Sequence, residues 1–352
     1  MNIRKILSLA FAATLLFNVS CSSDSDDVVL ETTFENGILI TNEGGFTTPT
    51  AEVSFVTNDL SALANKIYSG KNNEVLGNVL QTIGFDGNNA YLVSNVPNKI
   101  DIVNRYTFKK QATVTTNLQN PRYIAFSGNQ YYVTNNNFFD VMKLNVYNKD
   151  NSFVKSISFA RSAEKVVEAN GNIVVQTDGV TYESTPPYSE LPTGYTITIV
   201  KASTNVVDKT VTLPSNGIIR DLISYNGDAY VLASDNTNSY IYKINSTTGA
   251  YTTTTLTAIP QAQKLRIDAN KFYFFNSSNK IYSMTVGSTT VPTTPIVTTT
   301  GNLYGFNVID GKIFASDASF TADSKVNVYN ATNGSLLKTF TTGIGTNGFY
   351  KN

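Results

Sequence analysis

The chain contains no histidine, no tryptophan and a single cysteine, and charged residues make up only 15% of its 352 positions. Without histidine it cannot build a Ser-His-Asp triad, a Cys/His dyad or a His-ligated zinc site, and one cysteine excludes an internal disulfide framework. Basic and acidic side chains balance at 26 each, which makes nucleic acid a poor partner. We therefore expect no metal, no resident cofactor and no enzymatic activity.

Small neutral polar residues are abundant, whereas charged residues are few. The sequence has 41 asparagines and 45 threonines. Threonine is β-branched and favours strands, whereas asparagine suits turns and left-handed backbone positions. This composition predicts an all-β protein with many short turns.

The N-terminus has the pattern of a secretory signal. Arg4 and Lys5 precede an apolar run over residues 6–17, which is too short to span a bilayer as a helix. Val19 and Ser20 before Cys21 resemble the lipobox of bacterial lipoproteins, although Asn18 stands where that motif usually has leucine. We predict a lipoprotein signal peptide over residues 1–20 and lipidation at Cys21. The alternative is an ordinary secreted protein.

Residues 21–35 form an acidic tether in this interpretation. Asp24, Asp26 and Asp27 lie among serines, with too few apolar groups to fold. The segment resembles the acidic tag that directs lipoproteins to the outer face of the outer membrane in some Gram-negative bacteria. The expected location is the outer membrane, with a lipid anchor, exposed at the cell surface.

An internal repeat follows, over residues 36–352. Each unit has an apolar strand, a tight turn and an aromatic-rich second strand, as in TIGFDGNNAYLVSN and LISYNGDAYVLAS. The turn centres are Gly87, Gly128, Gly171, Gly227, Asn270 and Gly311, spaced by 41, 43, 56, 43 and 41 residues. This period matches a four-stranded propeller blade, and Asn-Gly and Asp-Gly pairs are strong hairpin signals.

Six complete units leave a fragment at each end. The N-terminal ENGILITNEG lacks a first strand, and the C-terminal TNGFYKN supplies one with nothing after it. Joining the two fragments removes the exposed sheet edges of an open array. We therefore predict a seven-bladed β-propeller closed by the C-terminal strand, with a β-helix or a pair of β-sandwiches as alternatives.

The segments GILITNEGGF near the start and GTNGFY near the end, together with the repeated strand pair, resemble surface lipoproteins of the YncE-like propeller class. The resemblance covers roughly residues 36–352. Members of that class include proteins that cap TonB-dependent transporters and capture cobalamin. The resemblance therefore implies a capture role at the cell surface, a TonB-dependent transporter as partner and a cobalamin-like cofactor among the candidate ligands.

Candidate ligand contacts lie six or seven residues before each turn centre, where inner strands begin near the axis of a propeller. These positions hold Gln81, Arg122, Lys165, Arg220, Lys264 and Tyr304, with Asn347 in the closing strand. Four of the seven are cationic, which suits a small polar or anionic ligand. The alternative is that each cation pairs with a neighbouring carboxylate, for example Arg220 with Asp221.

Aromatic side chains in the loops between second and third strands extend this site. Phe138 and Phe139 lie in one such loop. The fourth unit carries an insertion, GVTYESTPPYSELPTG, in which Tyr182 and Tyr188 offer rigid contacts.

The expected function is a ligand-capture subunit of an uptake system. The alternatives are a protein-interaction module of an envelope complex and, against the expectation of no enzymatic activity, a hydrolase. The hydrolase would have to use paired carboxylates, for which Asp178, Glu183 and Glu190 are candidates.

Overall fold

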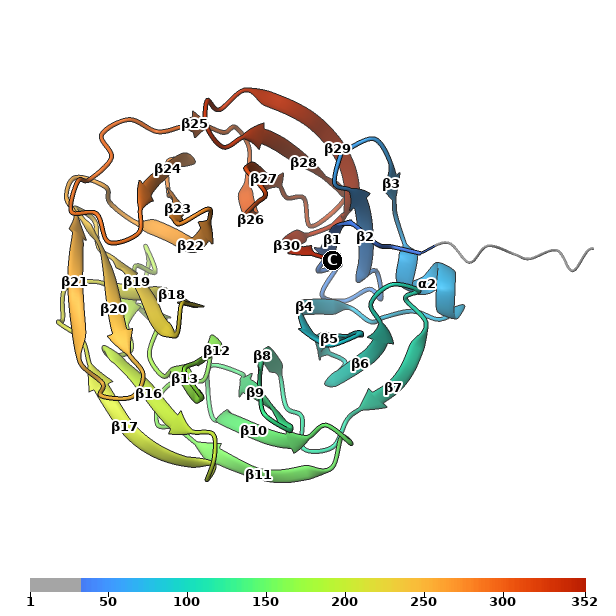
Figure 1. Cartoon of the computed structure of the whole chain (residues 1–352), viewed down its shortest axis with the longest axis horizontal. Helices are drawn as coiled ribbons and strands as arrows, with labels where there is room; N and C mark the ends of the chain where they lie inside the picture. Colours follow the sequence, from blue (N-terminus) through green and yellow to red (C-terminus); the bar gives the residue numbers. More distant parts are fainter. Residues whose placement is uncertain (1–32) are drawn as a thin grey trace, which may run out of the picture. The chain divides into compact units, whose positions relative to one another are not determined.

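Seven four-stranded antiparallel sheets surround a central axis in the computed structural model, which describes residues 33–352 (Figure 1). This arrangement is a seven-bladed β-propeller, as predicted. The predicted signal peptide, Cys21 and all but the last three residues of the predicted tether lie outside the described residues. Within residues 33–352, no helix is both long enough and apolar enough to cross a membrane.

The strands of the first three blades run in sequence order from the axis outward, except that β30 is the innermost strand of blade one. Blade one has β30 (Thr346–Lys351), β1 (Gly37–Asn42), β2 (Glu52–Thr57) and β3 (Leu63–Ala64). Blade two has β4 (Val79–Asp86), β5 (Asn89–Val96), β6 (Lys99–Asn104) and β7 (Lys110–Val114). Blade three has β8 (Pro121–Ser127), β9 (Gln130–Asn136), β10 (Met142–Asn148) and β11 (Phe153–Ser158).

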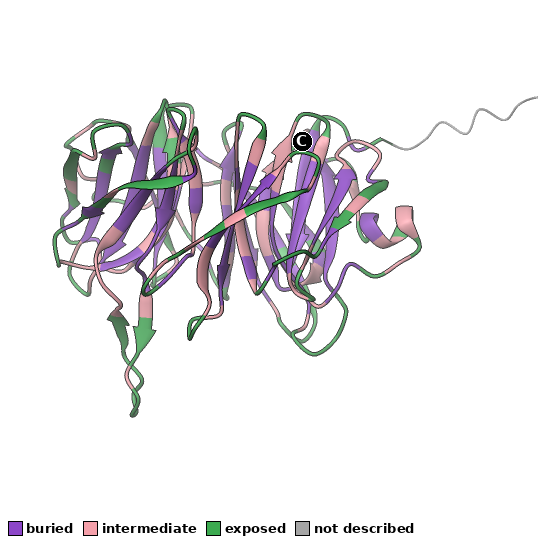
Figure 2. Cartoon of the chain, turned by 90° about the horizontal axis from the view of Figure 1, so that it is seen from below, coloured by how far each residue is buried: buried purple, intermediate pink, exposed green. Residues whose placement is uncertain are grey.

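Blade four contains the predicted insertion. It has β12 (Val166–Ala169), β13 (Asn172–Gln176), β16 (Thr196–Lys201) and β17 (Val206–Thr212). Between β13 and β16, the strands β14 (Val180–Tyr182) and β15 (Glu190–Pro192) pair as a separate hairpin. We call residues 180–192 the β14–β15 hairpin; it projects from one face of the ring (Figure 2).

The last three blades return to the simple pattern. Blade five has β18 (Ile218–Tyr225), β19 (Asp228–Ser234), β20 (Ser239–Asn245) and β21 (Tyr251–Leu256). Blade six has β22 (Ala262–Asp268), β23 (Lys271–Asn276), β24 (Lys280–Thr285) and β25 (Val297–Thr298). Blade seven has β26 (Leu303–Ile309), β27 (Lys312–Asp317), β28 (Asp323–Asn330) and β29 (Leu336–Ile344).

The tight turns between first and second strands explain the repeat. At Asn226 and Gly227 both central residues have positive φ, 50° and 80°, as a type I′ turn requires. The same pair of positive values occurs at Asp310 and Gly311. The predicted turn centres therefore hold the residue types that tolerate left-handed backbone.

The ring closes through the two ends of the described chain. β30 pairs antiparallel with β1, placing Phe349 opposite Ile40 and Tyr350 opposite Leu39. Phe349 is 2% exposed and packs on Phe314 of blade seven. The C-terminal strand thus joins the last blade to the first, which confirms the predicted closure.

Tyrosine and phenylalanine fill the spaces between blades, where tryptophan is absent. Tyr91 of blade two and Tyr131 of blade three have ring centroids 5.3 Å apart, and Tyr131 stacks on Tyr147 at 5.0 Å. The three rings are essentially buried, and each such burial contributes roughly 1.5–3 kcal/mol. The short helix α2 (Ile67–Asn72), which follows β3, covers the outside of blade one with buried Ile67 and Tyr68.

Candidate functional site in the axial channel

The predicted axial residues lie at irregularities of the innermost strands. The pairing register between first and second strands breaks at Gln81, Arg122, Arg220, Lys264, Tyr304 and Asn347. In blade four, Lys165 directly precedes β12, and its carbonyl accepts a hydrogen bond from the Gln176 N–H at 2.8 Å. A β-bulge re-aims the side chain of its extra residue and is over-represented next to functional sites.

Six of the seven predicted residues line one cavity of about 440 Å³ on the axis: Gln81, Arg122, Lys165, Lys264, Tyr304 and Asn347. Arg220 is the exception. Asp221 and Arg266 line this cavity too, although the sequence did not single them out as site residues. The positions are therefore brought together as expected, while their roles as ligand contacts remain predictions.

Asp221 is the electrostatic centre of the cavity. Its carboxylate is 1% exposed; Oδ2 accepts from Arg266 Nη1 at 2.7 Å, and Oδ1 lies 3.6 Å from Lys165 Nζ. The N–H groups of Leu265 and Leu222 also donate to it, at 2.9 and 3.0 Å. Burial alone would raise the pKa of Asp221, but Lys165 and Arg266 hold it below its usual value. Asp221 is thus ionised at neutral pH.

Lys264 differs from the other cavity cations because no carboxylate among residues 33–352 pairs with it. Its Nζ donates to the Tyr304 carbonyl and lies 4.7 Å from the Tyr304 ring centroid. Burial lowers the pKa of Lys264 to about 7, with the charges of Arg266 and Lys165 adding to the effect. Lys264 is therefore a half-buried amine that changes charge near neutral pH.

Arg122 is paired, as the alternative interpretation expected. Its guanidinium donates to Glu164 at 2.7 Å and to Gln81 Oε1 at 2.5 Å. The Phe138 ring covers it, with the centroid 5.2 Å from Cζ. Phe138 itself has a φ of 65° and is 55% exposed, so it forms the solvent side of the channel mouth.

Arg220 turns away from the cavity toward the β14–β15 hairpin. Its Nη2 donates to Glu190 at 2.6 Å, and its Nε to Ser234 Oγ at 3.2 Å. The expected partner Asp221 instead lies in the axial cavity, where it pairs with Arg266 and Lys165. Arg220 lies between the channel mouth and a neighbouring groove of about 640 Å³ that Tyr188 and Tyr195 also line.

Tyr304 connects the axial residues of blade seven to blade one. Its hydroxyl donates to Glu43 Oε2 at 2.7 Å. Burial raises the pKa of Tyr304, and the nearby Glu43 charge raises it further. Burial also raises the pKa of Glu43. The tyrosine therefore remains protonated and acts as a hydrogen-bond donor.

The predicted loop aromatics are exposed. Phe139 is 87% exposed, and Tyr182 and Tyr188 on the β14–β15 hairpin are 59% and 58% exposed. Phe138 lines a pocket at the channel mouth together with Glu190 and Arg220. Tyr188 lines the neighbouring groove on the other side of Arg220. The pocket at the channel mouth and the neighbouring groove share Glu190 and Arg220, so they form one continuous surface.

The carboxylates considered for hydrolysis have other partners. Asp178 is fully buried and accepts from Arg161 at 2.5 and 2.7 Å and from the Thr196 N–H at 2.8 Å, which anchors the base of the insertion. Glu190 pairs with Arg220, and Glu183 is half-buried. In residues 33–352, no group of three or more acidic or cysteine side chains is placed to hold a metal ion.

These features define a seven-bladed β-propeller with a charged axial cavity. The chain belongs to the family described as domain of unknown function (DUF5074), whose pattern matches residues 36–350. A search of curated proteins finds no match to the chain.

Several solved structures share the fold at low sequence identity. A functionally unknown protein from Desulfotomaculum acetoxidans DSM 771 is 12% identical, with a TM-score of 0.65, over 90% of this chain and 98% of that one. The dihydro-heme d1 dehydrogenase NirN is 14% identical, with a TM-score of 0.56, over 90% of this chain and 75% of that one. Hydrazine synthase from Kuenenia stuttgartiensis is 12% identical, with a TM-score of 0.53, over 78% and 92%. Two of these neighbours are enzymes by description, and all three share the fold alone.

Proposed function

We propose that this protein is a lipid-anchored outer-membrane protein that captures a small anionic or carbonyl-rich ligand at the mouth of the propeller axis. In this proposal it serves as the capture subunit of a TonB-dependent uptake system, as its resemblance to YncE-like surface lipoproteins implies. The lipobox-like segment before Cys21 and the acidic tether support the location.

The observation that carries the ligand class is Lys264. Arg122, Lys165 and Arg266 already have carboxylate partners, so an incoming anion would have to displace one. Lys264 has no carboxylate partner among the described residues and lies half-buried at the cavity wall. A ligand carboxylate or phosphate would form a charge-assisted hydrogen bond there, one of the stronger polar contacts available to a protein.

The neighbouring surface supports an organic ligand rather than a bare ion. The Phe138 ring at the mouth and Tyr188 in the adjoining groove offer flat apolar contacts. Gln81 and Asn347 add amide groups to the cavity wall. Aromatic faces combined with a few polar groups are typical of small-molecule sites.

The test is calorimetric titration of the protein with two probes: citrate as a small carboxylate and cyanocobalamin as a carbonyl-rich ligand of the class implied by the resemblance. We expect binding of at least one probe at pH 7, and an at least tenfold loss in Lys264→Met. For citrate, affinity should fall as pH rises above 7, because Lys264 must be protonated to bind an anion. Lys280→Met, at an exposed position of β24, is the matched control.

A protein-interaction module is the second candidate. The 87% exposed Phe139 and the 59% exposed Tyr182 lie away from the axial cavity, and exposed aromatics often mark protein interfaces. Loss of the β14–β15 hairpin without any change in probe binding, but with loss of a membrane partner in a pull-down of the lipidated protein, would favour this function. Failure of both probes to bind, together with recovery of a partner, would replace the capture proposal.

A further inference from the structure

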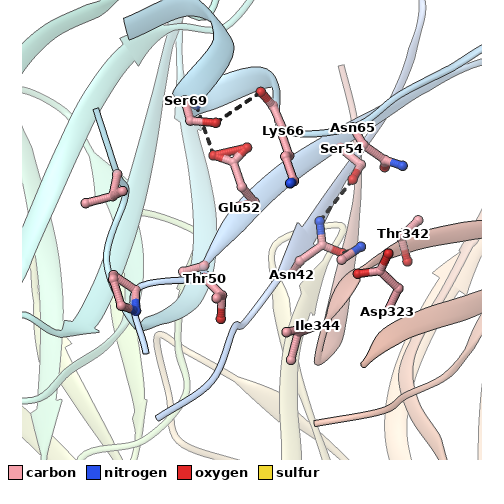
Figure 3. A pocket seen from close by; sticks show the side chains of 14 residues that line it. Asn42, Thr50, Glu52, Ser54, Asn65, Lys66, Ser69, Asp323, Thr342 and Ile344 are labelled. Carbon is pink, nitrogen blue, oxygen red and sulfur yellow. Dashed lines mark hydrogen bonds between the residues drawn. The ribbon is translucent and has the colours of Figure 1, made fainter. Parts of the chain in front are cut away.

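A second pocket lies where blade one meets blade seven. It has a volume of about 300 Å³ and shares no lining residue with the axial cavity. Its walls come from β1 and β2, from the segment around α2, and from β28 and β29 (Figure 3). It is therefore a different pocket from the axial cavity.

Glu52 is the unusual group in this pocket. The side chain comes from β2, is only 8% exposed, and its Oε1 accepts a hydrogen bond from the Ser69 N–H at 3.0 Å. Oε2 is buried and has no hydrogen-bond partner among residues 33–352. Leaving a buried carboxylate oxygen unsatisfied is costly. Figure 3 shows the carboxylate at the pocket wall, between Ser69 and Lys66.

The two amide side chains that line the pocket already donate to other groups. The Asn42 amide donates from Nδ2 to Ser54 Oγ at 3.0 Å, and its Oδ1 accepts from the Gly343 N–H at 3.0 Å. Asn65 Nδ2 donates to the Thr341 carbonyl at 3.1 Å. Burial raises the pKa of Glu52 to about 7, with the hydrogen bond from Ser69 and the charge of Lys66 opposing the rise. Glu52 Oε2 therefore has no donor in this structure, and a ligand N–H can supply one.

The charge and the remaining surface indicate the chemistry of that ligand. Three charged side chains line the pocket, Glu52, Asp323 and Lys66, so two carboxylates face one amine. This balance favours a monocation over an anion. The apolar side chains of Ala51, Val75 and Ile344 add an apolar part to a wall that otherwise carries mainly neutral polar groups, and they suit a hydrocarbon body rather than a hydrated metal ion.

We propose that this pocket binds a small organic cation whose primary ammonium group donates to Glu52 Oε2 and whose apolar body packs against Val75 and Ile344. The site is independent of axial ligand capture. Binding satisfies the orphaned oxygen and pairs a carboxylate that otherwise lies buried beside a single lysine.

The test is ligand-observed NMR and calorimetric titration of the full chain with 2-phenylethylammonium, and with 2-phenylethanol as its neutral counterpart. The ammonium compound should bind at least tenfold more tightly than the alcohol. Glu52→Gln should reduce ammonium affinity at least tenfold and leave the alcohol unchanged. Lys66→Met, which removes the competing cation, should strengthen ammonium binding severalfold. A purely structural role for Glu52 predicts none of these ligand-specific changes.

Two further variants keep the test decisive. Glu35→Gln removes an exposed carboxylate outside the pocket and should have no effect. Val75→Trp at a 61% exposed wall position should obstruct the pocket and abolish binding while the protein still folds. The proposal is overturned if the ammonium compound fails to bind the parent protein, if it binds no better than the alcohol, or if Glu52→Gln binds it as well as the parent.

Discussion

Replacing Lys264 with methionine should make the protein more stable at neutral pH. The pKa of this amine falls from 10.5 to about 7 on folding, which corresponds to about 5 kcal/mol for holding the charged form in the cavity. At pH 7 the lysine is half protonated in the folded state and fully protonated in the unfolded state. The resulting penalty is about 4 kcal/mol.

Methionine removes this penalty and also some favourable contacts. The hydrogen bond from Nζ to the Tyr304 carbonyl and the contact with the Tyr304 ring are lost, which costs roughly 1–2 kcal/mol. Lys264→Met should therefore raise the free energy of unfolding by about 2–3 kcal/mol at pH 7. Methionine fills a similar volume and adapts to irregular gaps.

The stability gained in Lys264→Met should depend on pH. A lysine whose folded pKa is depressed destabilises the protein most below that pKa, and the penalty fades as pH rises from about 7 toward 10.5. Urea unfolding of the parent, Lys264→Met and the control Lys280→Met at pH 7 and pH 10 measures this. The advantage of Lys264→Met should shrink strongly at pH 10. A variant less stable than the parent at pH 7, or an advantage independent of pH, would refute the reasoning.

Two further predictions concern the ends of the chain. Cys21→Ser should abolish acylation and release the protein from membranes, because no helix in residues 33–352 can span a bilayer; partitioning into a detergent phase measures this, and a variant that stays in the detergent phase contradicts the lipoprotein interpretation. Deleting Thr346–Asn352 removes β30 with its buried Phe349 and opens the ring, so the melting temperature should fall by about 10 °C or more. An unchanged melting curve would mean that closure contributes little.

The blade period and the closure were predictable because they depend on local chemistry. Positive φ at turns such as Asn226–Gly227 restricts the residue types allowed there, so the turns are visible in sequence. The unmatched strand segments at the two ends of the repeat predicted the seventh blade. The helix on the outside of blade one could not be predicted. Helix α2 begins after Lys66, which has a left-handed backbone conformation, and it has no side-chain cap, so the sequence carries no helix-start signal.

The axial site was predictable in position but not in pairing. A fixed offset from each turn locates the bulged residues because every blade repeats the same inner strand. Which carboxylate meets which cation depends on side-chain direction at a bulge and on contacts between blades. Glu164 reaches Arg122 across 42 residues, and Asp221 reaches Arg266 across 45. A rule of one residue per blade also overlooked Arg266, two positions after Lys264 on the same strand.

The pairing pattern assigns different tasks to the cations around the axis. Arg122, Lys165 and Arg266 pair with carboxylates that are themselves largely buried, so these ion pairs stabilise the shape of the cavity. Exchanging a buried carboxylate for a ligand anion would leave the carboxylate unpaired, which would offset the free energy gained from the new contact. Arg220 pairs with Glu190, whose side chain is 42% exposed, so this contact is weaker and more easily exchanged. In the capture function proposed above, a ligand that enters between Phe138 and the β14–β15 hairpin would meet Arg220 first and Lys264 last. The exchangeable pair at the mouth would then admit the ligand, and Lys264 would supply the contact that selects its charge.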